Sequence, residues 1–218
     1  MVLDIIQYKN SLYDELAHFS KGLASNKRLE ILDLLLQASK SVDSISRDTG
    51  NSVANTSRHL QVLKESHLVT SSRNGNQIIY SLASENVVSL VRTLMKVGEH
   101  ESSEMKYIQK EADNDQYVKT ISLEKVRQEI DNIFLLDVRP KDEYITNHIL
   151  GAINIPLNEL IDNINIIPKN KKIIVYCRGR LCANSNFAVK KLNQYGLNAY
   201  SLNSSVHDWQ EISHNSDS

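Results

Sequence analysis

The two cysteines of the chain, Cys177 and Cys182, lie close together in the segment VYCRGRLCANSNFAV. Cys177 follows the apolar run KKIIVY, and a helical pattern begins just after Cys182. A thiol between the end of a strand and the start of a helix faces backbone N–H groups and the positive end of the helix dipole, which stabilise a thiolate. Arg178 and Arg180 add positive charge. We therefore predict that Cys177 is a nucleophile at neutral pH that needs no neighbouring histidine.

Two roles are open for Cys182. It packs against the start of the following helix, or it is a resolving thiol that forms a disulfide or polysulfide bridge with Cys177. A cysteine pair in a reducing compartment serves redox, metal or nucleophilic chemistry more often than it staples a fold. Since the nearby sequence offers these two thiols no third ligand, we expect no metal site and no cofactor.

The second half of the chain alternates short β-rich runs with helical segments, a pattern typical of a mostly parallel sheet covered by helices. This predicts an α/β domain with Cys177 at the carboxyl end of a strand. The predicted strands are 117–121, 133–138, 173–176 and 199–202, and the predicted helices are 123–130 and 184–192.

The first half carries a different pattern, a helix-turn-helix followed by a hairpin. Ser41 is a candidate cap for a short helix that ends near Thr49-Gly50, and Asn51 or Ser52 caps a second helix that runs to about Glu65. Asn74-Gly75 then predicts a two-residue hairpin turn. A mainly-α winged helix-turn-helix domain follows, whose second helix enters the major groove of DNA.

Polar side chains on the second helix could contact bases and phosphates, and a cation at the wing tip could reach a phosphate. The alternative is a winged helix used only for protein contacts, or, for His59 alone, a partly buried histidine. The candidate DNA-binding residues are Ser52, Val53, Asn55, Thr56, Ser57, Arg58, His59 and Arg73.

A helix over 84–105 is apolar over a wider arc than one buried stripe needs, which predicts a homodimer formed by this helix and the N-terminal helix. Beyond this helix the apolar residues no longer recur at helical spacing, and charged residues become frequent. We divide the chain into a DNA-binding and dimerisation domain over 1–105, a linker over 106–115 and a second domain over 116–218. No segment is apolar for the roughly 20 residues that span a bilayer, and the start lacks a signal pattern, so we expect a cytoplasmic protein.

The first domain resembles the ArsR family of dimeric winged-helix repressors, on SRHLQVLKESHLV followed by RNGNQIIYSLA. The resemblance covers about residues 12–105 and implies binding to a double-stranded DNA operator. One departure is His67, where members of the family usually carry a glycine that ends the recognition helix. Histidine tolerates the left-handed conformation better than most residues, but at a cost.

The second domain resembles rhodanese domains, on LLDVRPKDEYITNHILGAINIP, VYCRGRLC and GLNAYSLNSSVHDW. The resemblance implies that Cys177 accepts sulfur as a persulfide, with Asp137 and Arg139 in support. The active-site loop of this chain departs at Arg180 and Cys182 from the loop sequence that is common in the family. The candidate catalytic residues are Cys177, Arg178, Asp137, Arg139 and Cys182.

Together these patterns predict a homodimeric transcriptional repressor whose operator binding responds to sulfane sulfur at Cys177. A second hypothesis is a working sulfurtransferase that the winged helix only locates at DNA. A third is a metal- or metalloid-responsive regulator that uses Cys177 and Cys182. The sequence does not identify the operator, the sulfur donor or acceptor, or how the signal passes between the domains.

Overall fold

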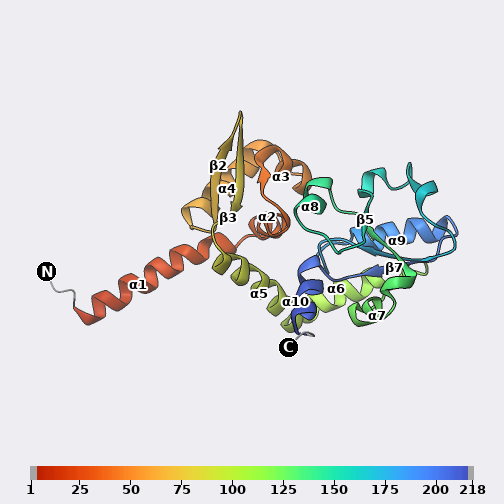
Figure 1. Ribbon diagram of the computed structural model, residues 1–218. Helices are drawn as coiled ribbons and strands as arrows, with labels where there is room; N and C mark the ends of the chain where they lie inside the picture. The colour runs from red at the N-terminus through yellow and green to blue at the C-terminus, as the bar shows by residue number, and fades with distance from the viewer. Residues whose placement is uncertain (1–3, 216–218) are drawn as a thin grey trace. The chain divides into compact units, whose positions relative to one another are not determined.

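The computed structural model describes residues 4–215, and the chain divides into two compact units with the boundary between Val97 and Gly98 (Figure 1). Two domains of different class were predicted, and this is confirmed. Among the described residues, no helix is both long and apolar enough to cross a membrane.

The first unit is a mostly helical winged-helix domain. Its three-stranded antiparallel sheet has the order β1-β3-β2, and its core lies where α2, α3, α4 and α5 bury their apolar sides. In chain order the elements are α1 (Ile5–Ser20), η1 (Lys21–Leu23), α2 (Asn26–Gln37), β1 (Lys40–Ser41), α3 (Val42–Thr49), α4 (Val53–Glu65), β2 (Val69–Asn74), β3 (Gln77–Leu82) and α5 (Glu85–Glu101), the last of which extends past the boundary.

The predicted helix ends agree with the structure where a cap determines them. The side chain of Ser41 accepts a hydrogen bond from Ser44 N, and that of Ser52 accepts one from Asn55 N, so each satisfies a backbone donor at a helix start. Gly50 ends α3 at a φ of 65°, in the left-handed region that favours glycine.

The wing turn lies one residue later than predicted. Asn74 pairs with Gln77, so the two loop residues are Gly75 and Asn76 rather than Asn74 and Gly75. Gly75 has a φ of 58°, which suits the first central position of a tight hairpin turn.

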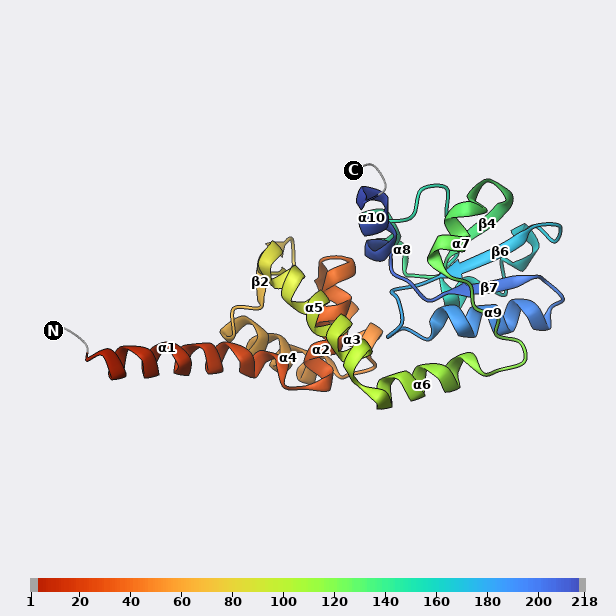
Figure 2. The same ribbon diagram turned by 90° about the horizontal axis from the view of Figure 1, so that it is seen from below.

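The second unit is a four-stranded, all-parallel sheet of order β5-β4-β6-β7 between two helical layers. One core lies between the sheet and α9, and the other lies between the opposite face and α7 and α10, which Figure 2 shows on the two sides of the sheet. The elements are α6 (Ser103–Asp113), α7 (Leu123–Gln128), η2 (Ile130–Asn132), β4 (Ile133–Asp137), α8 (Lys141–Thr146), β5 (Ile153–Asn154), η3 (Leu157–Glu159), η4 (Ile164–Ile166), β6 (Lys172–Tyr176), α9 (Asn184–Gln194), β7 (Ala199–Leu202) and α10 (Val206–Asn215).

The helix predicted over 84–105 is two helices in the structure. Ser102 separates α5 from α6, and its side chain accepts a hydrogen bond from Met105 N as the N-cap of the new helix. The segment interpreted as a linker over 106–115 lies largely within α6. A serine cap in a charged segment thus begins an element that hydrophobic periodicity alone did not indicate.

The recognition helix α4 ends in a Schellman motif built on a histidine. His67 N donates to Lys64 O at 3.0 Å and Leu68 N donates to Leu63 O at 2.9 Å, which are the two hydrogen bonds that define the motif. His67 has a φ of 55°, the one positive φ of a non-glycine residue in the described part of the chain. The helix therefore ends where a glycine would end it, at the cost of left-handed strain in a residue with a Cβ.

Replacement of this histidine by glycine should stabilise the winged-helix unit. His67 is exposed, so His67→Gly removes left-handed strain without a loss of buried contacts, and we expect about 0.5–1 kcal/mol of added stability. Thermal and urea unfolding of the full chain measures it, with His67→Ala as the control because alanine keeps the Cβ. A glycine variant no more stable than the alanine variant would contradict the strain argument.

Candidate functional site

The cysteine loop, residues 177–183, connects the end of β6 to the start of α9. Cys177 follows Tyr176 directly and is 1% exposed, while Cys182 is partly exposed. Gly179 has a φ of 115°, and a Cβ there would lie 3.4 Å from that of Ser205. Cys182 N donates to Gly179 O at 3.0 Å. The loop is therefore a tight turn that brings its second cysteine back toward the first.

The two sulfur atoms lie 2.8 Å apart, and both cysteines are free thiols. The hydrogen bond that Cys177 Sγ donates lowers the pKa of Cys182 to about 6, with help from the backbone N–H of Asn184 and the charge of Arg178, and against burial. The same hydrogen bond, together with burial, raises the pKa of Cys177 well above its ordinary value. These opposite shifts favour a thiolate on Cys182, the partly exposed member of the pair, while the sequence predicted the thiolate on Cys177.

The arginines of the loop face carboxylates rather than a thiolate. Arg178 forms a bidentate ion pair with the fully buried Glu143 of α8, at 2.9 Å from Nε to Oε2 and 2.6 Å from Nη2 to Oε1. Arg180 Nη1 pairs with Asp113 Oδ2 of α6 at 2.8 Å. Each guanidinium is paired with a carboxylate, and the charge of Arg178 still acts to lower the pKa of both cysteines, as expected from the sequence.

Asp137 and Arg139 form a second buried ion pair, 2.7 Å from Nη2 to Oδ2, at the end of β4. Burial opposes the charge of Arg139, but the hydrogen bonds and charge of Asp137 hold its pKa above the ordinary value. Arg139 also donates from Nη2 to Asn147 O, just after α8. The pair thus holds the turn that carries α8, and with it Glu143, against the sheet.

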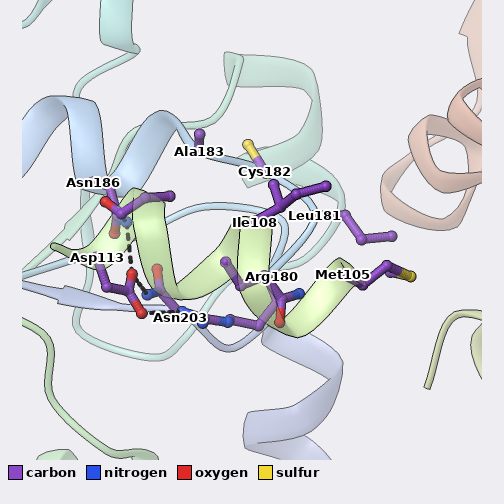
Figure 3. Close-up of a pocket in the computed structure, with 11 residues that line it drawn as sticks. Met105, Ile108, Asp113, Arg180, Leu181, Cys182, Ala183, Asn186 and Asn203 are labelled. Carbon is purple, nitrogen blue, oxygen red and sulfur yellow. Dashed lines mark hydrogen bonds and ion pairs between the residues drawn. The ribbon is translucent and has the colours of Figure 1, made fainter. Parts of the chain in front are cut away.

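Helix α6 forms one wall of a pocket beside the cysteine loop. The carboxylate of Asp113 accepts hydrogen bonds from Arg180, Asn186 and Asn203, at 2.8, 2.8 and 3.1 Å, as Figure 3 shows. The pocket has a volume of about 280 Å³ and is lined by Met105, Ile108, Gln109, Ala112, Asp113, Arg180, Leu181, Cys182, Ala183, Asn186 and Asn203. Sequence reasoning missed Asp113 because nothing in a charged segment distinguishes the one aspartate that contacts a distant loop.

The exposed face of α4 carries most of the predicted DNA-binding residues. Thr56 is the exception: it is fully buried, so its prediction as a DNA contact is wrong. His59 is half-buried, and Arg73 at the wing is exposed and donates from Nε to Gly75 O at 3.1 Å. The exposed members of the predicted set on this helix and its cap are Ser52, Val53, Asn55, Ser57 and Arg58.

A winged helix-turn-helix unit followed by a parallel-sheet unit with a cysteine loop defines a DNA-binding regulator joined to a rhodanese-like domain. The model of the bacterial regulatory proteins of the arsR family matches residues 25–71, and that of the rhodanese-like domain matches residues 122–212. An HTH-type transcriptional regulator of Mycobacterium tuberculosis is 33% identical over 93% of this chain and 90% of its own length. The chain belongs to the ArsR-type transcriptional regulators fused to a rhodanese domain.

Two solved structures are each similar to one unit of the chain. A homodimeric winged helix-turn-helix DNA-binding domain from Mycobacterium bovis is 39% identical, with 42% of this chain and 86% of that one covered, at a TM-score of 0.41. A rhodanese-related protein from Thermoplasma volcanium is 31% identical, with 43% of this chain and 92% of that one covered, at a TM-score of 0.40.

The contact between the two thiols predicts how the alkylation of Cys182 depends on pH. In the wild type, alkylation of Cys182 should rise with pH through a midpoint near 6, because its thiolate is already formed above that pH. In Cys177→Ala the donated hydrogen bond is lost, and the midpoint should move toward the ordinary thiol value of about 8.5. Iodoacetamide labelling followed by peptide mass measurement gives both curves. The same midpoint in the two proteins would show that Cys177 does not stabilise the thiolate.

Proposed function

We propose that the chain is a dimeric repressor whose operator binding changes when the cysteine loop takes up sulfane sulfur, held as a persulfide on Cys177. The observation that carries the proposal is the pair of sulfurs 2.8 Å apart in the loop of a rhodanese domain. One thiolate and one thiol at this distance suit attack on a sulfur donor and transfer between neighbours. The winged-helix unit contains no cysteine, so a sulfur signal enters through this loop.

The exposed polar face of α4 supports operator binding by the winged-helix unit. Its side chains offer short donors and acceptors, and Arg58 adds a positive charge. Because net charge near −1 gives the whole chain no general attraction to DNA, binding would rely on this local face and on Arg73 of the wing.

The apolar face of α1 supports a dimer. This helix has no buried residue, and Ile5, Leu12 and Leu16, which follow one another at helical spacing, are 84%, 53% and 57% exposed. On α5, Leu94 and Val97 are 38% and 51% exposed. Apolar stripes of this length on two helices are typical of a surface that a second copy covers.

Sulfur-dependent operator binding is tested on three proteins, wild type, Cys177→Ser and Cys182→Ser, titrated with operator DNA with and without polysulfide. We expect the wild type to gain sulfur in its intact mass and to change its operator affinity by tenfold or more, a coupling free energy of about 1.4 kcal/mol. Cys177→Ser should lose the change in affinity.

Two outcomes would count against sulfur sensing. A wild type that gains sulfur but binds the operator unchanged, and that turns over a donor through Cys177, would favour the sulfurtransferase with a merely localising winged helix. No sulfur-dependent change in mass or affinity in any of the three proteins would end the proposal. Arg58→Ala serves as a DNA-binding control, since it should weaken the operator complex with or without polysulfide.

If the dimer forms through the apolar face of α1, acidic substitutions in that face should disrupt the dimer. Leu12→Glu with Leu16→Glu should convert the dimer to a monomer. Operator binding should weaken at least tenfold, because a monomer contacts only one half-site whereas a dimer contacts both half-sites at once. Analytical ultracentrifugation and an operator titration measure the two effects. Ser11→Glu, on the polar side of the same helix, should change neither, and a dimer that persists in the double variant would place the interface elsewhere.

A further inference from the structure

The pocket between α6 and the cysteine loop has features that the thiol pair itself does not explain. Helix α6 lies before residue 122, so this wall is outside the region that matches the rhodanese model. The volume of about 280 Å³ lies just below the range of roughly 300–1,000 Å³ that is typical of pockets for drug-sized ligands. A ligand that fits here is small, the size of an amino acid derivative.

Two residues that line this pocket each carry a buried side-chain polar atom with no hydrogen-bond partner among the described residues. The atoms are Oδ1 of Asn186, a residue that is 8% exposed, and Nε2 of Gln109. The amide nitrogen of Asn186 donates hydrogen bonds to Ala112 O and Asp113 Oδ1. The amide oxygen of Asn186 therefore remains as an acceptor for a ligand. Buried polar atoms are rarely left unpaired, so an acceptor and a donor in one pocket indicate a ligand that brings an N–H and an oxygen.

The remaining wall favours an organic ligand over an inorganic anion. Met105, Ile108 and Leu181 supply apolar surface, and Ile108 and Leu181 are 58% and 48% exposed. The one cation of the wall, Arg180, is paired with its one carboxylate, Asp113. Such a wall has no net charge with which to attract a small dianion such as thiosulfate, whereas it suits a carbon chain with a polar end.

We propose that this pocket binds a small organic persulfide, RS–SH, with an amine or amide N–H for Asn186 and a carboxylate or carbonyl oxygen for Gln109, and presents its outer sulfur to Cys182. This rests on the proposed function and names the class of donor. The Cys182 thiolate attacks the outer sulfur, the S–S bond of the donor breaks, RS⁻ leaves, and Cys182 carries the persulfide and its proton. Cys177 then attacks the same sulfur; its own proton passes to Cys182 as the Cys182 persulfide bond breaks.

Pocket variants with two donors test the proposal. The proteins are wild type, Gln109→Leu, which removes the donor with little change in size, and Ala112→Trp, which fills the pocket; Lys110→Gln on α6 but outside the pocket is the control. Cysteine persulfide and inorganic polysulfide are the two donors. Intact and peptide masses follow sulfur on Cys182 and Cys177 with time, and thermal unfolding checks that each variant is folded.

With cysteine persulfide we expect sulfur on Cys182 first, at a rate that falls about tenfold in Gln109→Leu and further in Ala112→Trp, while Lys110→Gln matches the wild type. Rates with inorganic polysulfide should change less than threefold. The pocket proposal is overturned if both pocket variants react with cysteine persulfide as fast as the wild type does. It is also overturned if the variants lose their reactivity with cysteine persulfide and with inorganic polysulfide to the same extent.

A binding measurement separates this proposal from the proposed function. S-methylcysteine has no transferable sulfur, and calorimetry should detect its binding to the wild type and the loss of that binding in Ala112→Trp. If it binds in this way but sulfur never alters operator affinity, the pocket stands and the sensor fails. If sulfur alters operator affinity but S-methylcysteine does not bind and the pocket variants react normally, the sensor stands and the pocket fails.

Discussion

The buried ion pair between Arg178 and Glu143 determines the form of the cysteine loop. Two charges removed from water are stable only when they satisfy one another, and the bidentate geometry does this at 2.6 and 2.9 Å. Glu143 is fully buried, so the loop must return Arg178 to α8 wherever the rest of the backbone goes. This arrangement uses the guanidinium as a structural anchor. The Cys182 thiolate is stabilised chiefly by the neighbouring Cys177 thiol, with smaller contributions from the Asn184 N–H at the start of α9 and from Arg178 itself.

Much of the fold could be predicted because its signals are local. A serine cap, a glycine beyond a helix end and an apolar period act within a few residues, and they located α3, α4, β4 and β6 to within a residue or two. His67 shows how far such reasoning extends: the motif required a left-handed residue, and the chain adopts it with histidine. The wing turn moved by one residue because Asn74 and Gly75 suit a turn in either register.

The site was harder to predict because its chemistry depends on contacts between distant residues. The sequence correctly indicated two thiols between a strand and a helix, but it did not show the 2.8 Å contact between them. It also did not show that the arginines of the loop pair with carboxylates 35 and 67 residues away in the chain. Asp113 and Gln109 belong to a segment whose charge indicated a linker. Thr56 lies within a polar run on α4, and only the packing of that helix shows that its side chain faces inward.

Helix α6 lies between the two family spans, 25–71 and 122–212, and belongs to neither. Yet Asp113 ties it to the loop through Arg180, to α9 through Asn186 and to the segment after β7 through Asn203. The contacts that hold the cysteine loop in place therefore extend beyond the rhodanese domain as its family model defines it. A transplant that began at residue 122 would carry both cysteines into a new protein, but would leave behind the carboxylate that holds their loop from outside.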